Sequence, residues 1–384
     1  MQGKVVVIIE KEKRALPGRR SQAYLILSLV AVSGEFPANQ INRLHGGLAY
    51  KVKLLKALKS KKLIQTYYSD KLRGHRLTAK GKKALLEENS IRFESCLTGN
   101  TDTNQPKYEV TRRLRLHSIA ETITTMHNAG VSVYRDEKPD VFYPDDGTHP
   151  SLSMASPAFY NSREIKELGS ETVKIQGARA VGVLLTSSEV FVVYNSGGSL
   201  LKWDYKSEMR TKALIKTVLC RDRLSHQYQP ESVRALMLGK DMGQVYQLLT
   251  STGGVKRNYF MLDGNYDSFI YLTNDHNGEV MLKLLCDPEK INELNRILSE
   301  NTSKRDPGLL VENDAIDENG EPVLFAFDCD MPRITRFNSA LQLHDRKGTL
   351  ICVDFQADAL RRFCGGNVRI QAIDMNKLEG RFFP

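Results

Sequence analysis

The chain has 384 residues and a formal net charge of +10, with 41% hydrophobic and 26% charged residues. This composition is typical of a globular protein of two or three domains, and no apolar run approaches the roughly 18 residues of a membrane-spanning helix. The six cysteines are scattered without a CxxC pair, so we expect free thiols and no zinc site. The apolar run Val5–Ile9 is too short for a secretory signal and indicates a strand or an arm, so we expect a cytoplasmic protein.

The positive charge is concentrated near the N-terminus. Residues 1–90 hold 19 Lys and Arg against 6 Asp and Glu, a net charge of +13, whereas the rest of the chain holds 36 against 39, a net charge of −3. A cationic module beside a near-neutral remainder is typical of a protein that binds nucleic acid. A solvated basic surface without a partner is the alternative.

Three helices are predicted first. Gln22–Val32 is rich in apolar residues and is followed by Gly34, a helix stop. Pro37–Leu44 is a short candidate that ends before Gly46-Gly47, and Leu48–Lys62 is a longer one. Two helices joined by a tight turn that contains glycine form a helix-turn-helix arrangement.

The helix predicted at Leu48–Lys62 has two chemically different sides. At about 100° per residue, one side collects Leu48, Leu54, Leu55 and Leu58, with Lys51 close to it. Lys53, Lys56 and Ser60 fall on the opposite side, and Lys59 lies at its edge. This division predicts a recognition helix that packs through its leucines and presents its lysines to DNA phosphates or base edges.

A two-stranded hairpin and a last helix follow. Leu63–Tyr68 alternates like a strand, Ser69–Gly74 makes a turn, and His75–Leu77 returns. Thr78 is a good N-cap for a helix at Ala79–Glu88. The cations predicted to contact DNA in the whole module are Lys53, Lys56, Lys59, Lys71, Arg73, Arg76 and Lys80.

The segment KALKSKKLIQTYYSDKLRGHRLTAKGKKAL resembles the end of many bacterial winged-helix domains. Those domains show a leucine-bearing recognition helix, a two-stranded wing and a helix with an LTxxGxxxL-like motif, which here is Leu77–Leu85. The resemblance implies a winged-helix domain that binds double-stranded DNA, and we assign it to residues 1–90.

Residues 91–130 are predicted to be a linker and a connector helix. The stretch 91–107 is polar and rich in turn residues, and Thr111–Asn128 carries a helical apolar stripe. Arg112, Arg113 and Arg115 stand at the start of that helix, where cations oppose the helix dipole. An ordinary solvated helix end is the favoured interpretation, and a contact with a nucleic-acid backbone is the alternative.

Residues 131–384 alternate short β-like and helical runs, which predicts a mixed α/β (α+β) domain without a nucleotide-binding glycine loop. The predicted helices are Trp203–Arg221, Met242–Thr250, Pro288–Leu298 and Ala357–Phe363. The predicted strands are Ala180–Leu185, Val190–Tyr194, Ala235–Leu238, Phe269–Thr273, Val280–Leu285, Val323–Phe327, Leu350–Phe355 and Val368–Ile373.

One group of residues in this domain could carry chemistry. Asp140, Glu164 and Lys166 resemble the PD…(D/E)xK pattern of restriction-endonuclease-like folds. In that pattern the carboxylates, here Asp140 and Glu164, hold Mg²⁺ and the lysine positions or activates water. The nuclease site requires Glu164 and Lys166 to lie on one face of a strand. However, Ser162–Gly169 also fits a capped short helix, which would not place the two side chains on the same face. A restriction-endonuclease-like fold without activity and an unrelated α/β fold are the alternatives, and no cofactor is expected unless the active-nuclease hypothesis holds.

The whole arrangement resembles the replication-relaxation proteins of plasmids and integrative conjugative elements in Gram-positive bacteria. The resemblance is carried by RGHRLTAKGKKAL, RLHSIAETITTMHNAGV and SREIKELGSETVKIQGARAVGVLLTSSEVFVVYNSGGSLLKW. It implies a role in replication, mobilisation or conjugative transfer of a mobile element, with double-stranded DNA and other transfer or replication proteins as partners. Two alternative functions remain: a transcriptional regulator with a sensing or dimerising C-terminal domain, and a Mg²⁺-dependent nuclease. A homodimer is also possible from the sequence.

Overall fold

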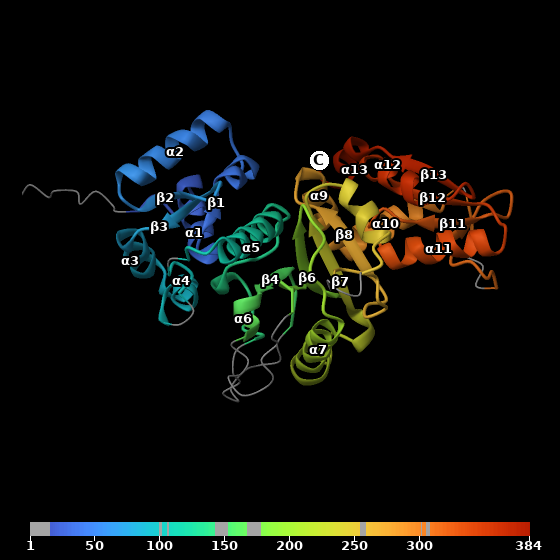
Figure 1. The fold of residues 1–384 in the computed structure, drawn as a ribbon, viewed down its shortest axis with the longest axis horizontal. Helices are drawn as coiled ribbons and strands as arrows, with labels where there is room; N and C mark the ends of the chain where they lie inside the picture. The colour runs from blue at the N-terminus through green and yellow to red at the C-terminus, as the bar shows by residue number, and fades with distance from the viewer. Residues whose placement is uncertain are drawn as a thin grey trace, which may run out of the picture. The chain divides into compact units, whose positions relative to one another are not determined.

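The computed structural model describes residues 16–99, 102–105, 107–142, 153–166, 178–253, 259–300, 302–304 and 308–384. The chain forms two compact units, Met1–Ala120 and Glu121–Pro384 (Figure 1). The predicted arm at Val5–Ile9 and the segment 144–151, which links Asp140 to Glu164 in the nuclease hypothesis, lie outside the described residues.

The first unit packs helices against a small antiparallel sheet in which the strand order is β1-β3-β2. Its core is α1, which the sequence predicted correctly and which is buried on nearly all sides. The Ser21 side chain caps this helix and Gly34, with φ of 82°, ends it. The elements are α1 (Gln22–Ser33), β1 (Phe36–Pro37), the 3₁₀ helix η1 (Ala38–Arg43), α2 (Leu48–Ser60), β2 (Ile64–Ser69), β3 (Leu72–Leu77), α3 (Ala79–Glu88), α4 (Ser90–Leu97) and the first part of α5 (Val110–Asn128).

The core of this unit continues past residue 90, where the sequence analysis placed the domain boundary. Helix α4 occupies the first part of the stretch predicted to be a polar linker, and its Phe93 and Leu97 are fully buried. The Thr103 hydroxyl then donates a hydrogen bond to the Ala31 carbonyl of α1. Residues beyond 90 therefore stabilise the first unit and do not simply connect it to the second.

The second unit contains two five-stranded sheets, drawn in green to yellow and in orange to red in Figure 1. The first contains β4 (Ala158–Asn161), β5 (Gly182–Leu185), β6 (Val190–Gly197), β7 (Val233–Gly239) and β8 (Phe269–Thr273), with helices α6 (Ser162–Lys166), α7 (Tyr205–Ile215, continued as a π-helix to Arg223), α8 (Gly243–Leu249) and α9 (His276–Leu285). The second contains β9 (Ser303–Lys304), β10 (Ala315–Ile316), β11 (Pro322–Phe325), β12 (Gly348–Val353) and β13 (Val368–Ile373), with α10 (Pro288–Leu298), α11 (Met331–Leu343), α12 (Asp354–Phe363) and α13 (Met375–Phe382).

The two sheets have the same connectivity. In each, the strands lie in sequence order, the first two pairings are antiparallel and the last two are parallel. After the third strand of each sheet, the chain continues in the order helix, strand, helix, strand, helix. We name β4 to α9 the first module and α10 to α13 the second module. Their equivalent helices α8 and α12 pack against each other, and one hydrophobic core runs through both modules.

The prediction of a mixed α/β domain is confirmed, but one of its strands was wrong. Val280–Leu285 belongs to helix α9, which the Asp275 side chain caps by accepting from the Gly278 amide. Every residue from Val280 to Leu285 except Lys283 is buried, so this short apolar run carries no periodicity that distinguishes a strand from a helix. No helix in the described part of the chain is long and apolar enough to cross a membrane.

Candidate nucleic-acid interface

Helix α2 presents a cationic side to solvent. Lys53 and Lys56 are exposed, as the angular analysis predicted. Lys51 is only 5% exposed and its Nζ donates to the Asn42 carbonyl at 2.9 Å, so it fixes the start of the helix. The prediction for Leu48 was wrong, because this side chain is 61% exposed in the first turn. The buried side of α2 is instead formed by Lys51, Leu58 and the half-buried Leu54 and Leu55.

Strands β2 and β3 are joined by a two-residue loop, Asp70-Lys71. Both residues have positive φ, 53° and 62°, as in the type I′ turns that match the twist of a hairpin. The loop exposes Lys71, and the second cross-strand pair from the loop exposes Arg73 and Tyr68, the tyrosine to 67%. A cation and an aromatic ring therefore stand together near the tip of the hairpin.

Lys71 is held in a backbone conformation that suits glycine. We expect Lys71→Gly to raise the free energy of unfolding by about 0.5–1 kcal/mol, because it removes the left-handed strain of a residue with a Cβ. Lys56→Gly, the same substitution within α2, should lower it by about 1 kcal/mol. Urea denaturation of both variants checks this, and a loss of stability in Lys71→Gly would show that the turn is not strained.

Lys59, near the end of α2, interacts electrostatically with Arg73 of the hairpin. Partial burial and the neighbouring charge of Arg73 both lower the pKa of Lys59. His75 lies beside them, and burial together with Lys59 and Arg73 lowers its pKa to about 4, so its ring is neutral at pH 7. Within the described residues neither Lys59 nor Arg73 forms an ion pair, so their mutual repulsion is not offset by a neighbouring carboxylate. Cations without an ion-pair partner favour an anionic ligand.

The prediction for Arg76 needs correction. Arg76 is only 6% exposed, and its guanidinium donates to Glu35 Oε2 at 2.9 and 2.6 Å and to the Lys107 carbonyl at 2.6 Å. Arg76 pairs with Gln65 across the hairpin, and the neighbouring residue His75 pairs with Thr66. Because successive residues of a strand point to opposite faces, the Arg76 side chain lies on the face of the sheet opposite to that of His75. Arg76 is therefore a buried structural cation and is not available to a ligand.

Glu35 is the centre of a buried charge network that the sequence did not reveal. Its carboxylate accepts from Arg76, from the fully buried Arg113 at 2.7 Å, and lies 2.9 Å from His117 Nε2. Burial by itself would raise the pKa of Glu35, but the hydrogen bonds from His117, Arg113 and Arg76 hold it at about 2.

Arg113 also holds the hairpin in place. Its Nη1 donates to the Ser69 carbonyl at 2.8 Å and its Nη2 to the Leu72 carbonyl at 2.9 Å, the two residues that flank the Asp70-Lys71 loop. The prediction of a solvated helix end for Arg113 was wrong, because this side chain is buried and paired with Glu35. Because α5 binds both ends of the loop, it fixes the position of Lys71 and Arg73 relative to the rest of the first unit.

Helix α3 carries the remaining predicted contact, Lys80, which is exposed in its first turn. The Thr78 side chain caps α3 by accepting from the Gly81 amide at 3.1 Å. Its hydroxyl also donates to the Lys62 carbonyl at 2.5 Å. The LTxxGxxxL-like motif therefore joins α3 to the end of α2.

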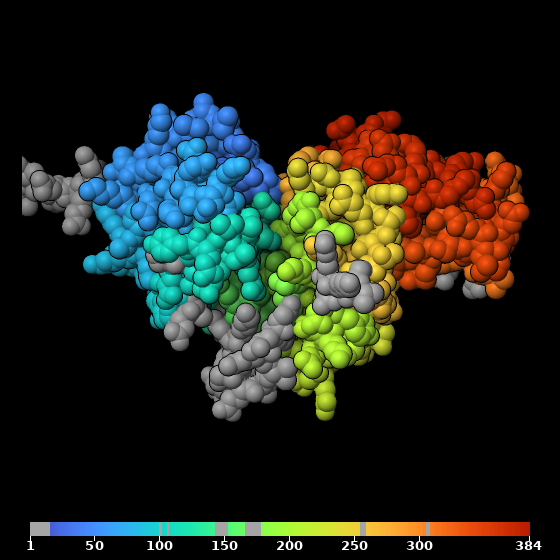
Figure 2. Space-filling model, in the orientation of Figure 1, coloured from blue at the N-terminus to red at the C-terminus, as the bar shows by residue number. Residues whose placement is uncertain are grey.

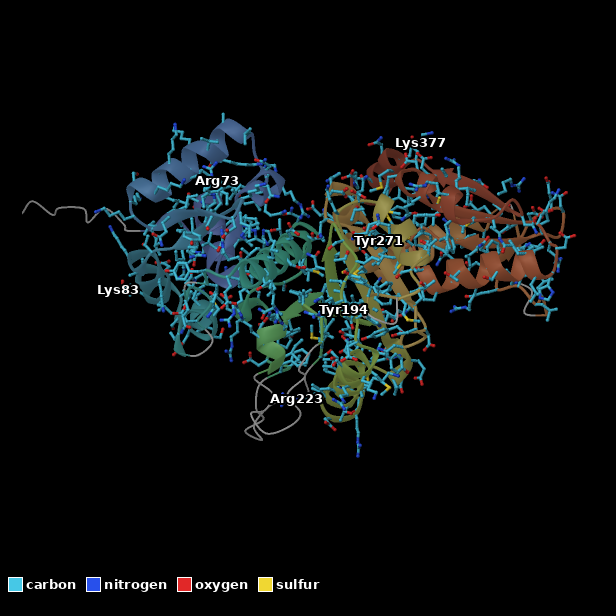
Figure 3. All side chains as sticks on the ribbon, viewed as in Figure 1. Arg73, Lys83, Tyr194, Arg223, Tyr271 and Lys377 are labelled. Carbon is cyan, nitrogen blue, oxygen red and sulfur yellow. The ribbon has the colours of Figure 1, made fainter. Side chains whose placement is uncertain are left out.

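The exposed cations of this surface have almost no acidic neighbours in sequence. Between residues 36 and 86 there are 13 Lys and Arg and a single acidic residue, Asp70. The blue atoms of α2 form an outer edge of the first unit in Figure 2, and Arg73 is labelled in Figure 3. We call this set the basic face, and it consists of the exposed Lys53, Lys56, Lys71, Arg73 and Lys80 together with the half-buried Lys59.

The residues of the nuclease hypothesis do not form the predicted site. Glu164 and Lys166 lie on helix α6, where two positions correspond to about 200°, so they do not share a face. Glu164 Oε1 binds the buried Lys138 Nζ at 2.7 Å and its Oε2 accepts from the Asn161 amide at 2.8 Å. Asp140 lies outside the strands, 3.6 Å from Arg135 Nε. The short-helix alternative is therefore confirmed over Ser162–Lys166, while 167–169 lie outside the described residues, and Glu164 is a structural partner of Lys138.

Comparison with known proteins adds no relative to this description. Searches of protein-family models, of curated proteins and of solved structures found no match to the chain.

Proposed function

We propose that this protein binds double-stranded DNA through the basic face, and that its first unit is a winged helix. The observation that carries the proposal is that α2 and the hairpin expose Lys53, Lys56, Lys71 and Arg73, while Asp70 is the single acidic residue between residues 36 and 86. A protein gains stability by separating such charges or pairing them, so their retention favours a phosphate ligand.

The order of elements supports this assignment. A helix, a short strand, a turn of 3₁₀ helix, a second long helix and a β-hairpin follow one another in the first unit. In our proposal α2 enters the major groove, where Lys53 and Lys56 reach phosphates or bases, and the β2–β3 hairpin contacts the adjacent backbone through Lys71 and Arg73. The exposed Ala49 and Val52 lie on the same side of α2 and suit contacts with thymine methyl groups.

The cellular role that we propose is replication, mobilisation or conjugative transfer of a plasmid or another mobile element. It is supported by the resemblance to the replication-relaxation proteins. The alternative, a transcriptional regulator, predicts protection of a palindrome near its own promoter, whereas the proposed role predicts protection of replication or transfer-origin DNA. Footprinting of both kinds of DNA distinguishes them.

The central test removes two cations from α2. We expect Lys53→Ala/Lys56→Ala to weaken binding to duplex DNA about tenfold or more at moderate salt. The slope of log K against log salt should become shallower by about 1.8, because each lost phosphate contact removes about 0.9. Fluorescence anisotropy at several salt concentrations measures both quantities.

The matched control is Lys347→Ala/Lys377→Ala, which removes the same charge from exposed positions of the second unit. It should leave the affinity and the salt slope almost unchanged. If the two double variants bind DNA equally well with equal slopes, α2 is not the recognition helix and the basic face is a solvated surface.

A further inference from the structure

A pocket of about 440 Å³ opens in the second unit, where β6 and β7 end. Both strands are parallel there, and small ligands commonly bind at the carboxyl ends of parallel strands. Its volume is in the range of ordinary small-molecule sites. The pocket is lined by residues of the first module, among them Gly198, Lys240, Asp241 and Gln247, and by Arg362 from α12 of the second module.

The charged side chains of the pocket come from both modules. Lys240 follows β7 directly, and Arg362 lies on α12 with its guanidinium carbon 4.7 Å from the centre of the Tyr246 ring. Within the described residues neither cation forms an ion pair, and both are exposed. Asp241 is the one carboxylate among the lining residues. The pocket therefore offers two cationic side chains and one carboxylate.

Buried hydrogen bonds hold the wall of the pocket in one conformation. Gln244 is only 4% exposed, and its Oε1 accepts from the Ser196 hydroxyl at 3.1 Å while its Nε2 donates to the Ser199 carbonyl at 3.0 Å. The hydroxyl of Tyr271, labelled in Figure 3, donates to the Asp241 carbonyl at 2.7 Å. The two loops that follow β6 and β7 are thereby fixed before a ligand arrives, which lowers the entropic cost of binding.

We propose that this pocket binds a small phosphorylated ligand of the nucleotide class. Lys240 and Arg362 neutralise the phosphate, the Asp241 carboxylate accepts hydrogen bonds from the sugar hydroxyls, and the Gln247 amide is available to the base. Because Lys240 and Arg362 belong to different modules, the ligand bridges the two modules. The proposal is independent of DNA binding, since the pocket and the basic face belong to different units of the chain.

The test is calorimetric titration of the full chain with AMP, ATP, adenosine and inorganic phosphate. We expect AMP or ATP to bind with a dissociation constant below the millimolar range, and adenosine and inorganic phosphate to bind at least tenfold more weakly. Lys240→Ala and Arg362→Ala should each weaken nucleotide binding tenfold or more. Arg361→Ala is the matched control, because Arg361 lies on the same helix but pairs with Asp358, and it should bind like the wild type.

Three outcomes would overturn the proposal. The first is no binding of either nucleotide at millimolar concentration. The second is equal nucleotide binding by the wild type and by the Lys240→Ala/Arg362→Ala double variant. The third is inorganic phosphate binding as tightly as AMP, which would identify an anion site without nucleotide recognition. A selective loss of the preference for AMP over phosphate in Asp241→Asn would support the assigned role of that carboxylate.

Discussion

Glu35→Gln is expected to lower the free energy of unfolding of the first unit by about 3–5 kcal/mol. The substitution keeps the shape of the side chain but removes the negative charge that Arg76 and Arg113 share in the interior. Removing one partner from a buried ion pair is far more damaging than losing a surface pair, because the remaining cations stay desolvated without compensation. Urea denaturation monitored by circular dichroism measures the change.

The same network predicts how stability depends on pH. The pKa of Glu35 lies at about 2 in the folded chain, against 4.5 for an ordinary glutamate. A carboxyl group with a depressed pKa stabilises the fold above its unfolded pKa, so the contribution of about 3 kcal/mol is complete above pH about 4.5. It is lost as the pH falls from about 4.5 towards 2. Glu35→Gln should abolish this part of the acid dependence.

Glu87→Gln is the control for both measurements. Glu87 is exposed and lies 3.7 Å from Lys83 in a surface pair, so its substitution should change the stability by less than about 1 kcal/mol. If Glu35→Gln were as stable as Glu87→Gln, the buried network would not hold α5 to the hairpin.

Gly81→Ala is expected to destabilise the first unit by about 3 kcal/mol, against the direction that helix propensity predicts. Alanine is the better helix former by about 1 kcal/mol. However, a Cβ at residue 81 would lie 2.1 Å from the Leu63 carbonyl oxygen, so α3 would have to move away from the end of α2. Thermal and urea denaturation check the sign of the effect.

Gly380→Ala provides the opposite case. Gly380 lies on α13, and a Cβ there meets no atom within 4 Å. We therefore expect the stability to change only through the higher helix propensity of alanine. The variant should be more stable than the wild type by up to about 1 kcal/mol. If both alanine variants gained stability, the close approach of α3 to Leu63 would be absent in solution.

The sequence by itself determined the elements whose signals are local. Helix α1 was predicted because a capping serine, an apolar run and a terminal glycine lie within a few residues of one another. The hairpin and α3 were predicted from strand alternation and from Thr78. The exposure of Lys53 and Lys56, and the exclusion of Lys51, followed from the helical period alone. The uneven distribution of charge along the chain needed no structure at all.

Only the tertiary structure decided which cations are free. Arg76 and Arg73 are close in sequence and chemically alike, yet Arg76 is buried because Glu35, 41 residues away, lies on its face of the sheet. Arg113 is bound by the same carboxylate from 78 residues away. The prediction of a metal site at Glu164 failed for the same reason, because the Glu164 carboxylate forms an ion pair with Lys138. Hydrogen bonds between distant segments leave no periodic signal in the sequence, so the partner of a buried charge is known only once the chain has folded.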